Sequence, residues 1–171
     1  MADLEKVEKL KAAGNVAFQK RQLTDALQSY TEAVEQLDSG REASEGAAEH
    51  APVEKKLLIA LLANRALTQL QLQAFQAAIE DAQRCLELDP RHSKAHYRLG
   101  AALRGVGDNA AASLSFQRAI QLAPQSLEAW RELRACHPSS AADGGEKMTK
   151  APQMPASCVL QHNLAMGLRG G

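Results

Sequence analysis

The chain repeats itself in two adjoining stretches, IALLANRALTQLQLQAFQAAIEDAQRCLELDPRH (residues 59–92) and SKAHYRLGAALRGVGDNAAASLSFQRAIQLAPQS (residues 93–126). The second stretch begins 34 residues after the first, and residues of similar size recur at the same places in both. Counted from the start of each stretch, positions 4, 8, 20, 24, 27 and 32 hold Leu62, Ala66, Ala78, Ala82, Cys85 and Pro90 in the first, and His96, Gly100, Ala112, Phe116, Ala119 and Pro124 in the second. Self-similarity at a period of this length predicts an array of stacked helical repeats.

A third copy of the pattern precedes these two, over residues 7–40. It holds Leu10, Gly14, Ala26, Tyr30 and Ala33 at positions 4, 8, 20, 24 and 27. Small residues at positions 8 and 20 allow two antiparallel helices to approach closely, and a proline at position 32 ends the second helix because it has no N–H to donate. In the first copy that position is Asp38. We therefore expect its second helix to continue.

These phased copies resemble the tetratricopeptide repeat family over about residues 7–126. The resemblance implies an all-α fold: a right-handed superhelix of three helix-turn-helix repeats and a short capping helix. We expect the repeats at about 7–40, 59–92 and 93–126, within a domain of residues 1–137. The cap is expected at 127–136, because the last repeat of an array cannot bury its own outer side. Trp130 is its largest apolar residue.

Two segments fall outside the period. Residues 40–54, rich in Gly, Ser, Ala and Glu, form an insertion that we interpret as a solvated loop, with the flanking helices extended. Residues 138–171 contain many Gly, Pro and Ser residues and few apolar ones, and we expect a disordered tail.

Composition favours no nucleic acid, membrane or redox function. The formal net charge is zero, no apolar run approaches the roughly 18 residues of a spanning helix, and the charged N-terminus does not resemble a signal peptide. The three cysteines, Cys85, Cys136 and Cys158, lack metal-ligand spacing. We expect Cys85 to be a small buried residue, the compartment to be the cytoplasm, and no metal or cofactor to bind.

Five polar residues are the candidate binding site. In the tetratricopeptide fold the first helix of each repeat lines a concave groove, and the resemblance places Lys11, Asn15, Asn64, Lys94 and Arg98 at groove positions of three successive repeats. Three cations and two amides, with no acid among them, suit a ligand with carboxylates. We expect these side chains to project into the open groove.

The five residues resemble the carboxylate clamp of co-chaperones that bind the Glu-Glu-Val-Asp ending of the cytosolic heat-shock proteins 70 and 90. By that resemblance, Lys11, Asn15 and Asn64 hold the main-chain carboxylate of the final aspartate. Lys94 and Arg98 hold its side-chain carboxylate and the nearby backbone. Phe18 and Leu67 lie beside these residues. Two roles remain open for them: an apolar shelf for the peptide, or packing in the core.

The resulting prediction is a co-chaperone or adaptor rather than an enzyme, since no phosphate loop, metal set or activated nucleophile is evident. Two alternatives remain open: a scaffold that binds a non-chaperone peptide through the same groove, and a tether that joins a chaperone to a further partner through the tail. The sequence does not indicate which of the two chaperones is preferred, what the client is or what the oligomeric state is. Nor does it indicate the roles of the insertion and the tail.

Overall fold

A computed structural model describes residues 3–42 and 52–136. These residues form seven helices: α1 (Leu4–Gln19), α2 (Leu23–Glu42), α3 (Pro52–Gln71), α4 (Phe75–Leu88), α5 (Ser93–Gly105), α6 (Asn109–Leu122) and α7 (Leu127–Cys136). None of the described residues lies in a strand. The expected all-α array of three helix pairs and a cap is therefore confirmed, whereas most of the 40–54 insertion and the whole 138–171 tail, with Cys158, lie outside the described residues.

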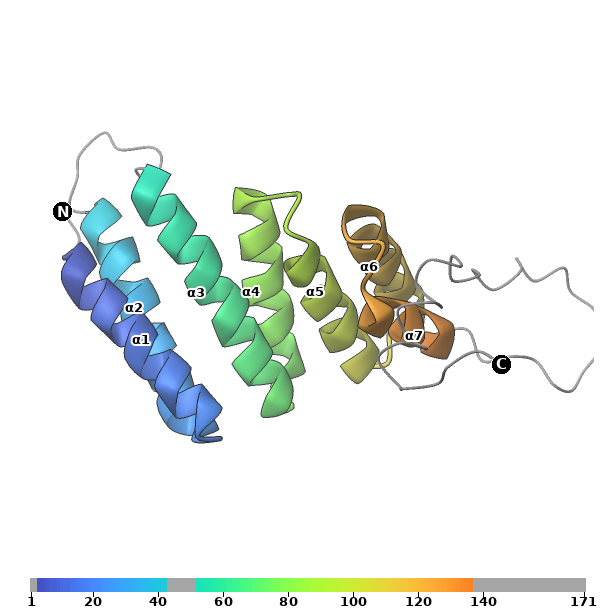
Figure 1. Ribbon diagram of the computed structural model, residues 1–171, viewed down its shortest axis with the longest axis horizontal. Helices are drawn as coiled ribbons and strands as arrows, with labels where there is room; N and C mark the ends of the chain where they lie inside the picture. The colour runs from blue at the N-terminus through green and yellow to red at the C-terminus, as the bar shows by residue number, and fades with distance from the viewer. Residues whose placement is uncertain (1–2, 43–51, 137–171) are drawn as a thin grey trace, which may run out of the picture.

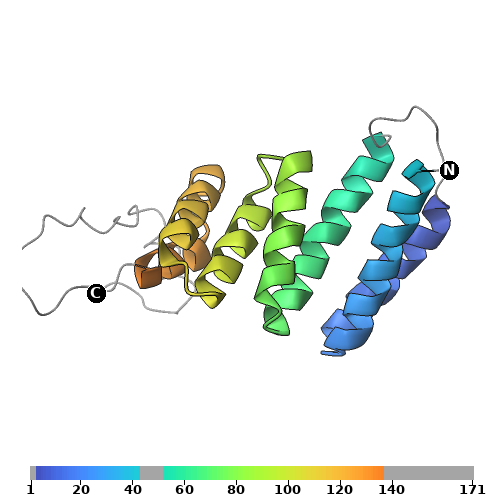
Figure 2. The same ribbon diagram turned by 180° about the vertical axis from the view of Figure 1, so that it is seen from behind.

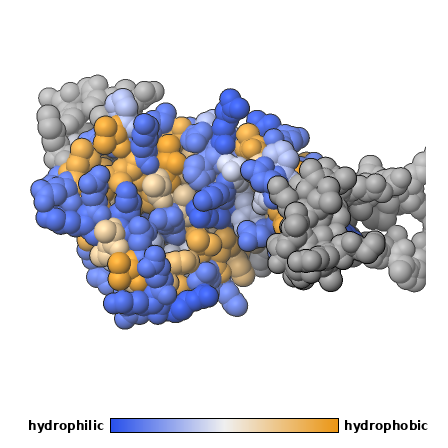
Figure 3. All heavy atoms as spheres, in the orientation of Figure 1, coloured by the Kyte–Doolittle hydropathy of each residue, from blue (hydrophilic) through white to orange (hydrophobic). Residues whose placement is uncertain are grey.

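The helices stack in chain order, each against the next (Figures 1 and 2). The first helix of each pair also contacts the first helix of the next pair, so that α1, α3, α5 and α7 form one continuous layer. This layer carries all five candidate site residues. On the face shown in Figure 1, hydrophobic side chains occur in separate patches among hydrophilic ones (Figure 3). No described helix is long and apolar enough to cross a membrane.

The two prolines end their helices as predicted. Helix α4 ends at Leu88 and α6 at Leu122, in each case two residues before the proline. Helix α2, which has no such proline, continues to Glu42, and Asp38 on this longer helix forms an ion pair with Arg84 of α4. The residue that replaces the proline therefore links the first repeat to the second.

The turn inside each helix pair has the same left-handed geometry. Arg21, Gln73 and Gly107 occupy position 15 of their repeats and have φ angles of 63°, 59° and 90°. In each turn the residue after this one donates its N–H to the carbonyl five residues back, as when Gln22 bonds Ala17 at 2.9 Å. This is a Schellman motif, which satisfies the last carbonyls of the first helix. The sequence signalled it only at Gly107, since a left-handed conformation favours glycine.

Each aromatic residue at position 24 packs directly on a glycine at position 8. A Cβ atom added to Gly14 would lie 2.6 Å from the Tyr30 ring, and one added to Gly100 would lie 2.8 Å from the Phe116 ring. In the middle repeat, Ala66 and Ala82 occupy the same two positions, and both are buried. In the first and third pairs a small residue therefore lies beneath a large one, whereas the middle pair packs two small residues.

The cap closes the apolar core. Trp130 is 8% exposed and lies in one cluster with Phe116, Ile120 and Leu133. Its indole N–H donates to the Pro124 carbonyl at 3.0 Å, so the polar atom of the ring is also satisfied. Cys85 is fully buried as expected, and burial raises the pKa of its thiol to about 11.

We predict that Gly100→Ala lowers the free energy of unfolding by about 1–3 kcal/mol, the usual cost of overpacking. Alanine alone favours a helix over glycine by about 1 kcal/mol, so the two effects have opposite signs. Urea unfolding followed by circular dichroism measures the change. The double variant Gly100→Ala, Phe116→Leu should recover part of the loss. A Gly100→Ala protein that is more stable than the parent would show that the helices are not in tight contact.

Candidate functional site

The structure brings the five candidate residues onto three adjacent helices of one layer. Lys11 and Asn15 lie on α1, Asn64 on α3, and Lys94 and Arg98 on α5. Since α1 contacts α3 and α3 contacts α5, residues from three repeats meet along one surface. Their local environments differ sharply.

Asn15 and Asn64 form a hydrogen-bonded pair. The Asn15 side-chain carbonyl oxygen accepts from the Asn64 amide at 3.1 Å and from the Tyr30 hydroxyl at 2.8 Å. With its oxygen held on both sides, Asn15 turns its NH2 group away from Tyr30, and that group donates to no described residue. Asn64 also makes a side-chain hydrogen bond with the Tyr30 hydroxyl, so the three polar side chains form one network. This network leaves the Asn15 NH2 group in a fixed orientation for a ligand.

Tyr30 is a site residue that sequence reasoning missed, because its position in the repeat indicated packing alone. The third repeat shows that packing needs no hydroxyl, since Phe116 fills the equivalent place over Gly100. The available signal was a tyrosine at position 24 of a repeat that has an asparagine, Asn15, at position 9. Burial raises the pKa of the Tyr30 hydroxyl, and the Arg98 charge partly opposes this shift, so the hydroxyl stays protonated and can donate.

Phe18 and Leu67 line a hollow of about 200 Å³ together with Asn15, Tyr30 and Asn64. Phe18 is half-buried and also packs against the core cluster of the first repeat. Both functions considered for Phe18 therefore fit its position. Leu67 also lines a second hollow, on the side of α5. The two hollows consequently share one wall.

Arg98 does not project freely into the groove, and the expectation that all five side chains do so is wrong for this residue. It is 9% exposed, and its Nη1 atom donates to the Ala63 carbonyl on α3. Burial lowers the pKa of its guanidinium, while Cys85 and Tyr30 oppose that shift; an arginine stays charged in proteins all the same. Arg98 thus joins α5 to the turn of α3 that carries Asn64.

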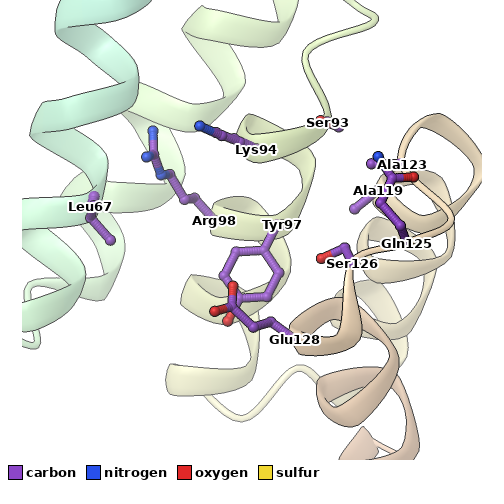
Figure 4. Close-up of a pocket in the computed structure, with 10 residues that line it drawn as sticks. All are labelled: Leu67, Ser93, Lys94, Tyr97, Arg98, Ala119, Ala123, Gln125, Ser126 and Glu128. Carbon is purple, nitrogen blue, oxygen red and sulfur yellow. The ribbon is translucent and has the colours of Figure 1, made fainter. Parts of the chain in front are cut away.

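The second hollow has a volume of about 350 Å³ and lies between α3, α5, α6 and α7. Figure 4 shows Lys94 and Arg98 extending from α5 toward the helix that carries Leu67. Lys94 is exposed. The remaining wall includes Tyr97, Ser126 and Glu128, none of which the sequence indicated. Lys11, half-buried and four residues before Asn15 on α1, lines neither hollow.

His92 caps the helix that carries both groove cations. Its Nδ1 atom accepts the Ala95 N–H at 3.1 Å, which requires the unprotonated ring nitrogen. Burial is the main cause that lowers the pKa of His92, with smaller contributions from the Arg98 and Lys94 charges and an opposing one from Asp89. The position of Lys94 and Arg98 therefore depends on a neutral histidine.

The chain is similar to known proteins that contain tetratricopeptide repeats. The family model "Tetratricopeptide repeat" matches residues 59–92 and 93–126. Among curated proteins, the human peptidyl-prolyl cis-trans isomerase FKBP4 is 35% identical over 133 residues, which is 78% of this chain and 28% of that protein. The chain spans 25–30% of the length of the first curated relatives that it matches.

Two solved structures resemble the chain and hold peptides. The first tetratricopeptide domain of Spaghetti (RPAP3), bound to the HSP90 peptide SRMEEVD, is 27% identical with a TM-score of 0.63; the match covers 79% of this chain and 93% of that one. The second such domain of human RPAP3, in complex with the HSP70 peptide SGPTIEEVD, is 25% identical with a TM-score of 0.62, over 77% and 95% of the two chains.

We predict that Tyr30→Phe lowers the free energy of unfolding by about 0.5–1.5 kcal/mol, the net worth of one hydrogen bond, and leaves helicity unchanged. The side-chain amide signals of Asn15 and Asn64 in a nitrogen–proton correlation spectrum should shift, because the shared acceptor loses one donor. Tyr97→Phe serves as the control and should leave both signals in place. Unmoved amide signals in Tyr30→Phe would mean that the hydroxyl does not orient the pair.

A second prediction concerns acid. Because the pKa of His92 lies below its ordinary value of 6.5 in the folded chain, the unfolded chain binds the proton more readily. The stability that this group contributes is complete above pH 6.5 and is lost as the pH falls below it, by up to about 1 kcal/mol, the usual worth of an N-cap bond.

The test compares the parent with His92→Asn, which keeps a side-chain acceptor at the cap but does not titrate. Urea unfolding is measured at about pH 7.5 and about pH 5.5, on either side of the ordinary histidine pKa. The parent should lose more stability than the variant between the two. Equal losses would show that His92 protonation does not matter to the fold.

Proposed function

Because the chain carries tetratricopeptide repeats, we propose that it acts as a co-chaperone or adaptor that binds the C-terminal Glu-Glu-Val-Asp peptide of heat-shock protein 70 or 90. The observation that carries this proposal is the Asn15–Asn64 pair, held by Tyr30 so that the Asn15 NH2 group remains for a ligand. Similar domains bound to peptides with this ending support it. The cytoplasm, where these chaperones reside, is the proposed location.

A C-terminal aspartate suits the proposed site because it bears two carboxylates on one residue. The main-chain carboxylate would accept from the side-chain amides of Asn15 and Asn64 and from Lys11, with Asn64 exchanging its bond to Tyr30 for one to the ligand. The side-chain carboxylate would accept from Lys94 and from those guanidinium donors of Arg98 that do not bond Ala63. Hydrogen bonds between charged donors and carboxylates are the stronger kind. A peptide with a neutral, amidated C-terminus would therefore bind poorly.

The two α5 cations contribute unequally in this proposal. The interaction of Arg98 with a carboxylate is strengthened by its burial, because water screens it little. Lys94 is exposed, so its attraction is weaker and declines as salt rises. In this proposal the contact at Arg98 depends little on salt, whereas the contact at Lys94 weakens as salt rises.

The alternative is a scaffold that binds a non-chaperone peptide through the same groove. Such a scaffold would accept an internal segment, whereas the proposed clamp requires a free carboxyl terminus. A peptide with an amidated C-terminus separates the two. We propose no catalytic role and no cofactor for the groove, whose chemistry is that of binding.

We predict that Asn64→Ala weakens the binding of a Glu-Glu-Val-Asp peptide by about 1.5–3 kcal/mol, the worth of a hydrogen bond to a charged group, or roughly ten- to over a hundred-fold in affinity. Lys94→Ala should cost about 1 kcal/mol, since Lys94 is exposed. Arg98→Ala should cost at least as much as Asn64→Ala and should also lower stability, because it leaves the Ala63 carbonyl without its partner. Isothermal titration calorimetry measures these affinities.

Lys20→Ala is the matched control, because Lys20 is an exposed cation that lines neither hollow. It should leave peptide affinity unchanged. Amidation of the peptide should remove most of the affinity for the parent protein. If the amidated peptide binds as tightly as the free acid, the clamp is wrong and the scaffold alternative holds.

A further inference from the structure

One acid stands in the wall of the larger hollow without a partner. Glu128 lies in the first turn of α7 and lines the 350 Å³ hollow that Lys94 and Arg98 also line. Its side chain is exposed, and it forms no ion pair with any described residue. Glu132, one turn later on the same helix, is paired with Arg104 at 2.7 Å. Of these two acids, only Glu128 has its charge available to a ligand.

The hollow therefore has ends of opposite charge. Lys94 and Arg98 lie on its α5 side toward α3, whereas Glu128 extends from α7 on the other side of the Tyr97 ring (Figure 4). The carboxylates of Glu132 and Glu128 add to the effect of burial in raising the pKa of Tyr97, which shows that negative charge acts at this ring. Leu67, Ala119 and Ala123 supply apolar parts of the wall.

The order of helices in the groove layer orients a bound peptide. If the terminal aspartate occupies the site formed by α1, α3 and α5, the preceding residues continue toward α7, the next helix of the layer. An extended chain advances about 3.3 Å per residue, so the hollow next to α7 receives a side chain a few residues before the end. Charge complementarity at Glu128 favours a basic side chain at that place.

We infer that Glu128 forms a subsite for a basic side chain upstream of the peptide's terminal carboxylate, so that this groove selects tails with an arginine or lysine a few residues before the end. The inference rests on the proposed function and goes beyond it by naming the preferred tail. SRMEEVD carries such an arginine, and SGPTIEEVD has no basic residue. The groove accordingly favours tails of the first kind.

The preference is modest, because an exposed ion pair is worth little in water. A gain of about two- to five-fold in affinity is expected at low salt, and it disappears as salt rises. Glu128 has another effect, since an acid in the first turn stabilises its helix through the helix dipole. That effect changes stability and alters the affinities of all peptides alike, so it cannot produce a difference between two peptides.

The experiment measures affinities of SRMEEVD and of the same peptide with glutamine in place of arginine, by fluorescence anisotropy at low and high salt. The parent should bind the arginine peptide about two- to five-fold more tightly at low salt. Glu128→Gln should abolish the difference, and Glu128→Arg should reverse it. Glu87→Gln, which removes the same charge from an exposed residue outside this hollow, should retain the preference.

Two further peptides, RSMEEVD and SMREEVD, move the arginine by one position each way and test the register. The inference is overturned if the parent prefers arginine at none of the three positions, or if the preference survives in Glu128→Gln. The amidated form of SRMEEVD reports separately on the clamp. If the parent shows no Glu128-dependent preference for arginine but still binds the free acid much more tightly than the amide, the subsite alone is refuted. Equal binding of acid and amide refutes the proposed function.

Discussion

The close approach of the two helices within a pair is the constraint on which the rest of this molecule depends. Gly14 lies beneath Tyr30 and Gly100 beneath Phe116, at separations that leave no room for a Cβ atom. These contacts hold the first and third pairs together, and α1, α3 and α5 meet in one layer that carries side chains from three repeats. A change in this packing would move the site residues relative to one another, because Tyr30 lies at the first contact and bonds Asn15.

In the first repeat, Tyr30 both packs against Gly14 and takes part in the proposed binding site. The Tyr30 ring fills the space above Gly14, and its hydroxyl bonds Asn15, which in turn bonds Asn64 on the next repeat. Arg98 forms the corresponding link from the third repeat to the Ala63 carbonyl. The groove is therefore built from bonds between repeats, and substitutions at Tyr30 or Arg98 affect binding and stability together. Lys94 and Glu128 are exposed, and no bond from either to another repeat is found among the described residues.

Much of the fold followed from the spacing of small residues and prolines. Helices α4 and α6 end two residues before Pro90 and Pro124, and α2 runs past Asp38, as expected where the proline is absent. The left-handed turns at Arg21 and Gln73 could not be predicted in this way, because neither residue prefers that conformation and the Schellman hydrogen bonds impose it. The five candidate residues lie on three adjacent helices, α1, α3 and α5, and their role as a clamp stays a prediction.

Residue spacing by itself determined the repeat and the pairing of helices. These properties are periodic, and each repeat carries them in its own residues. The resemblance to the tetratricopeptide family then assigned Lys11, Asn15, Asn64, Lys94 and Arg98 to the first helices of three successive repeats. Tertiary structure alone decided that Arg98 is buried, that Tyr30 orients Asn15, and that Glu128 faces the groove cations across one hollow. Each of these depends on contacts between different helices. The distances involved are set by how the repeats stack, and no local pattern of residues encodes them.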